Sequence, residues 1–345
     1  MRGDWPYHCR VEHGSSHPGA GENGELAAAV RSVRIAGRVT RRLQQSLQGS
    51  FLTKEDRSPV TVADYAAQAL VSLTLPRGEA IVGEETAAAL EGADGRETLD
   101  KVVAAVGSEL PDASAEDVRA AIDRCSDAGG AKGRFWVLDP IDGTKGFLRG
   151  DQYAIALGLM EDGEVVGGVL GCPNLPSRLG RGCLFVAERG RGAHELPFEE
   201  DGGSARRIGV SGVASSGDAA FCESAEAMHS DHDRHARIAG RLGVTAPPVR
   251  MDSQCKYGAI ARGDASIYLR LPSSRTYREK IWDHAAGFIV VSEAGGAVTD
   301  AYGRPLDFSM GRTLDGNRGV VATNGLLHGA VLAAAAAVLP PGPGL

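Results

Sequence analysis

The stretch that most constrains this chain is an apolar run followed at once by two carboxylates, Trp-Val-Leu-Asp-Pro-Ile-Asp-Gly-Thr at residues 136–144. The apolar residues predict a buried strand, and Pro140 stiffens the backbone between Asp139 and Asp142. Gly143 permits a tight turn, after which Thr144 can begin a helix. Carboxylates at a strand's end suit a hard divalent cation, and backbone N–H groups at the turn could receive an anionic oxygen. The stretch therefore predicts phosphate chemistry, although by itself it is equally typical of an Asp-Pro turn followed by an Asp-Gly turn.

Three further stretches accompany this motif in a defined order. They are Ser-Pro-Val-Thr-Val-Ala-Asp at 58–64, Val-Gly-Glu-Glu at 82–85 and Ile-Trp-Asp-His-Ala-Ala-Gly at 281–287. Together the four resemble the signatures of the lithium-sensitive, Mg²⁺-dependent phosphomonoesterase superfamily, which includes inositol monophosphatases and 3′(2′),5′-bisphosphate nucleotidases. The resemblance covers the chain from about residue 22 to its end. It implies a layered α-β-α-β-α sandwich of two subdomains.

The resemblance also implies a centre of two or three Mg²⁺ ions. One metal would be held by Glu84, Asp139 and the Ile141 carbonyl, and a second by Asp139, Asp142 and Asp283. The chemistry is sensible because cations must offset the charge of a phosphate monoester before a nucleophile can approach. Bland alternatives exist: a Glu-Glu pair is often a solvated loop, and Asp283 could be the N-cap of a helix over residues 283–294.

The same resemblance assigns the activation of the attacking water to Thr144 and Asp64. A threonine hydroxyl is a poor base alone, so a carboxylate that takes its proton is a sensible partner. Asp64 could instead be an acid placed at a helix N-terminus, where the helix dipole favours it.

Three segments look more like bisphosphate nucleotidases than inositol enzymes: residues 145–153, 252–258 and 268–272. By resemblance, the substrate-binding residues are Gly143, Thr144, His229, Ser253, Lys256, Arg270 and Asp283. Lys256 and Arg270 would face the second, non-reacting phosphate, where fixed positive charge is required. His229 is ambiguous because His232 lies close by in the sequence.

These expectations converge on hydrolysis of the 3′-phosphate of adenosine 3′,5′-bisphosphate to give AMP, and the resemblance implies 3′-phosphoadenylyl sulfate as a second substrate. One alternative is an inositol mono- or polyphosphate phosphatase, which the long insertion at residues 86–132 disfavours. Another is an inactive nucleotide-binding regulator on the same fold, which the presence of every expected ligand disfavours.

The bulk properties fit a globular enzyme of 345 residues, with 43% hydrophobic and 23% charged residues. A net charge of −7 argues against a nucleic-acid polymer or an anionic membrane as partner, and we expect a monomer or weak dimer. The six cysteines are scattered, which favours reduced thiols and an intracellular location, cytoplasmic, or plastid or mitochondrial if the N-terminus is incomplete.

Local patterns predict a mixed α+β first half and an α/β second half. Helices are expected over residues 25–48 and 64–75, the second after a break at Ser58-Pro59, and a hairpin is expected at Asp162-Gly163 between strands 153–160 and 164–171. Residues 190–204 are expected to be a loop. We predict a disordered extension over 1–21, an α+β subdomain with the metal site over 22–172, and an α/β subdomain with the nucleotide-binding residues over 173–345.

Cys172 and Cys183 are a candidate redox pair. Each lies at the end of a predicted strand, and pairing of those strands would bring the two Cα atoms within disulfide range. Both positions match cysteines of plant-like members that the chain resembles, in which oxidation lowers activity. The alternative is two ordinary buried thiols.

Overall fold

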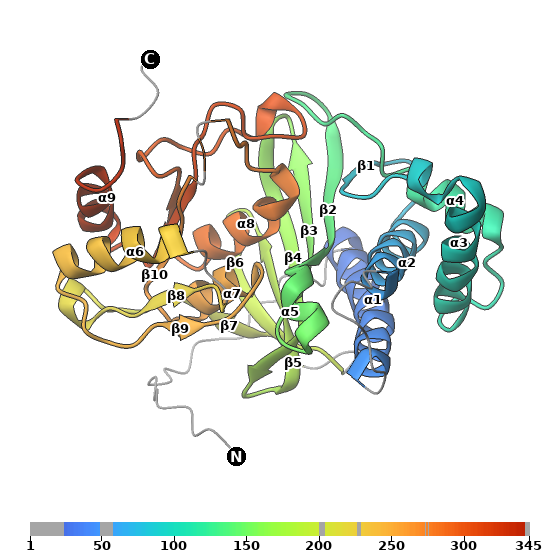
Figure 1. The fold of residues 1–345 in the computed structure, drawn as a ribbon, viewed down its shortest axis with the longest axis horizontal. Coiled ribbons are helices and arrows are strands. Elements are labelled where there is room, and N and C mark those ends of the chain that lie inside the picture. Colours follow the sequence, from blue (N-terminus) through green and yellow to red (C-terminus); the bar gives the residue numbers. More distant parts are fainter. Residues whose placement is uncertain are drawn as a thin grey trace.

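The computed structural model describes residues 24–48, 58–199, 204–225, 229–272, 274 and 276–341. Figure 1 shows these residues as alternating layers: α1 and α2, a seven-stranded sheet, α7 and α8, a five-stranded sheet, and α6 with α9. This order confirms the predicted α-β-α-β-α sandwich. The extension predicted over 1–21 lies outside the described residues.

The helices largely follow the predicted apolar spacing. Their bounds are α1 Gly24–Gln48, α2 Ser58–Thr74, α3 Gly92–Gly107, α4 Ala115–Asp123, α5 Thr144–Arg149, α6 His229–Leu242, α7 Cys255–Arg262, α8 Ala285–Glu293 and α9 His328–Ala336. The prediction that Ser58-Pro59 interrupts the chain and that the helix starts near residue 64 is wrong, because α2 begins at Ser58. A proline is tolerated in the first turn, where its missing N–H would have no partner within the helix. Within the described ranges, no helix combines the length and apolar character needed to cross a membrane.

The first sheet runs in chain order. Its strands are β1 Ala80–Gly83, β2 Arg134–Asp142, β3 Ala154–Glu161, β4 Glu164–Ser177, β5 Gly180–Glu188, β6 Gly192–Pro197 and β7 Arg206–Ile208. Only β1 and β2 pair in parallel within it; the other neighbours are antiparallel. The β3–β4 hairpin is confirmed. The prediction of a loop over 190–204 is wrong because this glycine-rich, charged segment contains β6, which is stabilised by pairing with β5.

The second sheet has the order β11-β12-β10-β8-β9. Its strands are β8 Phe221–Glu223, β9 Val249–Arg250, β10 Ile267–Arg270, β11 Ala297–Thr299 and β12 Val320–Thr323. The predicted division after residue 172 falls inside β4, and the first sheet continues to Ile208, while the division into subdomains itself stays a prediction.

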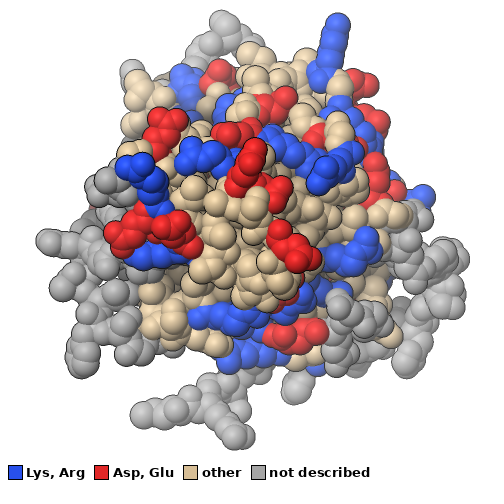
Figure 2. Space-filling view, turned by 90° about the vertical axis from the view of Figure 1, so that its right-hand side faces the viewer, with Lys and Arg blue, Asp and Glu red and all other residues tan. Residues whose placement is uncertain are grey.

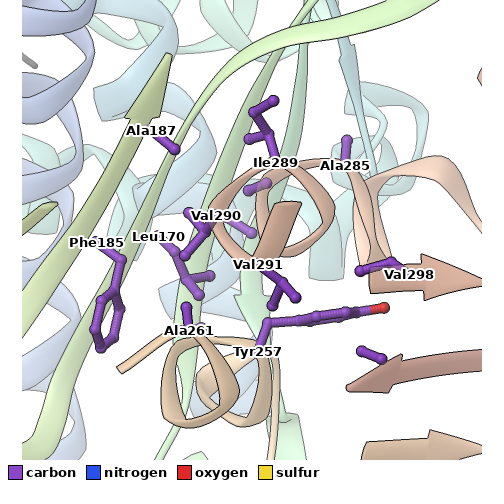
Figure 3. Close-up of a cluster of buried hydrophobic side chains, with 14 of the residues drawn as sticks. Leu170, Phe185, Ala187, Tyr257, Ala261, Ala285, Ile289, Val290, Val291 and Val298 are labelled. Atoms are coloured by element: carbon purple, nitrogen blue, oxygen red, sulfur yellow. The ribbon is translucent and has the colours of Figure 1, made fainter. Parts of the chain in front are cut away.

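The largest core cluster fills the space between the two sheets (Figure 3). Leu170 and Phe185 project from the first sheet toward α7 and α8, and Val298 approaches from the second. Tyr257 of α7 and Val290 of α8 are fully buried among them. The two central helices are thus fixed from both sides, which matters because Ser253 and Asp283, two of the predicted site residues, lie just before their N-terminal ends.

The packing of α8 against the first sheet depends on two glycines. A Cβ at Gly158 of β3 would lie 2.8 Å from the Cβ of Ala285, and one at Gly168 of β4 would lie 2.7 Å from Cγ2 of Ile289. Both distances are too short for real contacts, so α8 can lie this close to the sheet only where side chains are absent.

Gly158→Ala should therefore lower the free energy of unfolding by about 1–3 kcal/mol through overpacking. Urea denaturation of the wild type and the variant would measure the change. Gly240→Ala in α6 is a matched control, since its Cβ would meet nothing within 4 Å, and we expect it to be neutral or stabilising by about 0.5–1 kcal/mol. Equal stability of the two alanine variants would contradict close packing at Gly158.

Figure 2 shows the face that carries α3 and α4, on the right-hand side of Figure 1. Acidic and basic side chains are interspersed over it, without an extended patch of one sign. Surface ion pairs of the described residues include Arg38 with Glu109 at 2.6 Å and Lys101 with Glu97 at 2.8 Å. Such surface pairs contribute little to stability, typically less than about 1 kcal/mol.

Candidate active site

A pocket of about 390 Å³ opens where β2 and α5 meet the segment before α7. Its lining consists mainly of polar and charged residues: Asp142, Gly143, Thr144, Lys145, Gly146, Ser224, Asp252, Ser253, Gln254, Lys256, Tyr268, Arg270 and Asp283. Seven of the residues predicted from the sequence are in this set, although they come from four separate segments.

The central motif is arranged differently from the sequence-based expectation. The strand does not end before the two acids: β2 continues to Asp142, and its pairing with β3 is irregular between Asp139 and Asp142. Gly143 follows with φ of 88°, a conformation that favours glycine, and α5 begins at Thr144 as predicted. The irregular pairing coincides with Pro140, which cannot donate a hydrogen bond to a neighbouring strand.

The five expected acids form one electrostatic cluster, of which Asp142 and Asp283 line the pocket and the other three lie beyond its lining. Asp64 lies in α2, Glu84 directly follows β1, and Asp139 lies in β2. Burial and the neighbouring carboxylates raise the pKa of Asp64 and of Asp139 well above their usual range. Burial, then Asp283 and other acids, raises the pKa of Glu84 to about 7, although this side chain still reaches solvent. The acids are therefore close enough to repel one another.

This donor set fits a divalent cation. Asp139 is 2% exposed, and its Oδ1 has no hydrogen-bond partner among the described residues. Buried carboxylates without a compensating partner are costly, and a hard cation bound by several oxygens would satisfy them. The residues expected to hold Mg²⁺ are thus brought together, and their individual roles stay proposals.

Mg²⁺ should stabilise the protein more at about pH 8 than at about pH 5.5. For the metal-free protein, a folded-state pKa of about 7 for Glu84, against an ordinary 4.5, means that ionisation disfavours the folded state as the pH rises through this window. Bound Mg²⁺ offsets the cost of ionising Glu84 in the folded state. At lower pH the carboxylates are protonated, so Mg²⁺ must displace those protons and stabilises the protein less. Thermal unfolding with EDTA and with Mg²⁺, at constant ionic strength, would measure the difference. Equal stabilisation at both pH values would contradict a carboxylate site.

A positively charged side chain already occupies one flank of the cluster. Arg270 donates from Nη2 to Asp283 at 2.8 Å and pairs through Nε with Glu279 at 2.8 Å. Glu279 also lies 3.2 Å from Nε2 of His284, whose Nδ1 bonds the hydroxyl of Tyr257 at 2.7 Å. The carboxylates of Glu279 and Asp283 and the His284 imidazole form a group of ligand-type atoms within 4.8 Å of one another. We assign the charge compensation of this group to the Arg270 guanidinium.

Asp283 does not cap the following helix. It closes a 3-10 turn over Ile281–Asp283, and the N-cap position of α8 is His284. The alternative that Asp283 serves as the N-cap is therefore wrong, and its carboxylate lines the pocket instead.

The other predicted substrate residues are placed as follows. Lys256 is buried, and its Nζ lies 5.3 Å from the ring centre of Tyr268. Burial lowers the pKa of Lys256, and the charge of Asp142 partly offsets this effect. Ser253 lines the pocket beside Gly143. His229 begins α6, but its side chain lies outside the described residues.

Sequence reasoning missed several pocket residues. Asp252, Gln254 and Tyr268 lie in segments that resembled nucleotidases, but no role was assigned to them. Ser224 had no signal at all. A further residue, Arg312, contacts the neighbours of two of the acids. It donates from Nη2 to the carbonyl of Gly83, which precedes Glu84, and lies 4.8 Å from the ring of Trp282, which precedes Asp283.

The cysteine pair lies apart from the pocket lining. Cys172 of β4 and Cys183 of β5 are directly opposite each other, as the expected strand pairing requires. Both are buried free thiols, and burial raises the pKa of each. A disulfide between them stays a prediction.

A model of the inositol monophosphatase family matches residues 23–339. This chain belongs to that family. An extragenic suppressor protein suhB from Bartonella henselae shares the fold, with a TM-score of 0.60 at 21% identity over 90% of this chain and 97% of that one.

Curated relatives within the family are more similar in sequence. A 3′(2′),5′-bisphosphate nucleotidase from Oryza sativa is 48% identical over 335 residues, covering 90% of this chain and 93% of the relative. One from Emericella nidulans is 42% identical over 354 residues, covering 91% and 98%. The family assignment made from the four motifs is confirmed.

Proposed function

We propose that this chain is a Mg²⁺-dependent 3′(2′),5′-bisphosphate nucleotidase that converts adenosine 3′,5′-bisphosphate to AMP and phosphate. The observation that carries the proposal is the meeting of two zones of opposite charge in one pocket. Asp142 and Asp283 lie on its acidic side, while Lys256 and Arg270 line the same cavity. Burial raises the pKa of Asp142, and these two cations are close enough to offset part of that rise. A substrate with two phosphates needs both zones. The names of the curated relatives support the same activity.

In this proposal Glu84, Asp139, Asp142, Asp283 and the carbonyl of Ile141 hold two or three Mg²⁺ ions. Bound Mg²⁺ would offset the charge of the reacting phosphate and lower the pKa of a water molecule.

The remaining work falls to side chains of this chain. The Oγ1 of Thr144 accepts a proton from the attacking water and passes its own to the ionised carboxylate of Asp64. Lys256, Arg270, Ser253 and, by resemblance, His229 hold the non-reacting phosphate and the nucleoside. The N-terminal turn of α5, with Gly143 and Thr144, faces the reacting phosphate.

A substrate panel tests the proposal. With Mg²⁺ present, we expect kcat/KM for adenosine 3′,5′-bisphosphate to exceed that for inositol 1-phosphate by at least about 100-fold. The reason is that only the bisphosphate carries a second phosphate for Lys256 and Arg270 to bind. The same panel would include 3′-phosphoadenylyl sulfate, which we propose as a second substrate. We expect millimolar Li⁺ to inhibit, because a monovalent ion cannot supply the charge that the transition state requires.

Each alternative has its own outcome in that panel. Preference for inositol phosphates would make the chain an inositol phosphatase. Absence of Mg²⁺-dependent phosphate release from every substrate would favour an inactive nucleotide-binding regulator. Rates unaffected by tens of millimolar Li⁺ would contradict the lithium expectation alone.

A further inference from the structure

Gln254 lies between the segments that carry Asp142 and Asp283, immediately before α7. Its side chain is almost completely buried. Its Nε2 donates to the carbonyl of Trp282 at 2.8 Å, and its Oε1 accepts from the N–H of Gly287 at 3.2 Å. These partners fix the orientation of the amide, because the carbonyl can only accept and the N–H can only donate.

The same residue holds the opposite side of the site through its main chain. The N–H of Gln254 donates to the carboxylate of Asp142 at 2.5 Å. Trp282 directly precedes Asp283, and Gly287 lies in the first turn of α8. Gln254 therefore bonds directly to the carboxylate of Asp142. It also holds the main chain on both sides of Asp283, at Trp282 and at Gly287.

The backbone at this point is closely packed and adopts an uncommon conformation. Ser253, which precedes Gln254, has φ of 67°, a left-handed conformation that is uncommon for residues other than glycine. A Cβ at Gly143 would lie 2.7 Å from the Cβ of Ser253, so the backbone after Asp142 packs directly against Ser253. A strained turn held this tightly is typical of a segment that positions functional groups.

Asp142 and Asp283 line the same pocket, and two ionised carboxylates that face one cavity repel each other. Holding the backbone on both sides keeps such charges at a fixed separation.

We propose that Gln254 is a positioning residue that fixes Asp142 and Asp283 relative to each other and thereby sets the affinity of the site for divalent cations. The proposal rests on the metal-binding role proposed above for these two aspartates. Gln254 acts through these two aspartates, because its side-chain amide is already bonded to Trp282 and Gly287.

The test measures cation binding without substrate. Mn²⁺ titrations followed by electron paramagnetic resonance would compare the wild type, Gln254→Met and Gln254→Asn, with kcat and KM at saturating Mg²⁺ measured in parallel. Methionine keeps the side-chain length but lacks both polar atoms, and asparagine keeps the amide but is too short to reach both partners. We expect Gln254→Met to raise the Mn²⁺ dissociation constant by about tenfold, as for other residues that orient metal ligands, and to lower kcat with little change in KM for the nucleotide.

Gln44→Met is the matched control. Gln44 is also a buried glutamine, and its amide donates to the carbonyl of Phe147 at 2.9 Å and accepts from Asn174 at 2.6 Å. We expect it to lower stability to a similar degree without changing Mn²⁺ affinity.

The outcomes distinguish the positioning role of Gln254 from the metal assignment itself. Unchanged Mn²⁺ affinity in Gln254→Met, with a stability loss like that of Gln44→Met, would reduce Gln254 to a structural role and overturn the proposal. If Gln254→Met does not fold, the affinity of Gln254→Asn decides in the same way. A wild-type protein that binds no Mn²⁺ would overturn the metal assignment and the positioning role together, whereas normal wild-type binding with unaffected variants would overturn the positioning role alone.

Discussion

Asp142→Asn should lower kcat by at least about 100-fold, a loss of about 2.7 kcal/mol in transition-state stabilisation, while the fold is retained. The substitution removes one negative charge from the metal site without changing the volume of the side chain. An amide oxygen can still accept the hydrogen bond that Gln254 donates from its main chain, so the turn before α7 keeps its partner. Steady-state kinetics over a Mg²⁺ titration, together with thermal unfolding, would measure both effects.

Asp123→Asn is the control for this variant. Asp123 ends α4 and is exposed, so its substitution changes the net charge equally without touching the cluster. A rate for Asp142→Asn above about a tenth of wild type, a loss under about 1.4 kcal/mol, would show that Asp142 is not a metal ligand.

Arg270→Ala should raise KM for adenosine 3′,5′-bisphosphate by about 10-fold to 100-fold, in keeping with about 1.5–3 kcal/mol for a charge-assisted hydrogen bond. The guanidinium lines the pocket, and two carboxylates, those of Glu279 and Asp283, hold it in place. Because it also contacts Asp283, we expect kcat to fall for every substrate. The informative quantity is therefore the ratio of KM values for the bisphosphate and for adenosine 3′-monophosphate, which lacks the second phosphate.

Arg241→Ala, at an exposed position in α6, controls for the loss of one positive charge. We expect it to leave both KM values unchanged. If Arg270→Ala raised the two KM values equally, Arg270 would support Asp283 without contacting the second phosphate.

The acidic residues of the site could be predicted from the sequence because each lies in a short motif that is recognisable by itself. Asp139 and Asp142 follow an apolar run, and Glu84 follows a short buried strand. The parallel pairing of β1 with β2 then brings Glu84 near Asp139, since parallel strands end at the same edge of a sheet. Family resemblance supplied the grouping of these motifs, and the structure agrees with it.

Local patterns failed where tertiary contacts compete with them. The β6 strand lies in a glycine-rich, charged segment and is stabilised by its pairing with β5, which no local signal reveals. Asp283 has the sequence position of a helix cap, yet its carboxylate is held by Arg270 at the pocket. In both cases a partner distant in sequence outweighs the local preference.

The sequence by itself determined which acids and cations this protein has available and the order in which the chain presents them. Only the tertiary structure decided which other residues hold these acids and cations in place. Gln254 contacts carbonyl and N–H groups about 30 residues away, and Arg312 lies 229 residues from its partner Gly83. The physical reason is that such contacts use main-chain groups, which every residue possesses, so their partners leave no mark in the sequence and are set by how the layers pack.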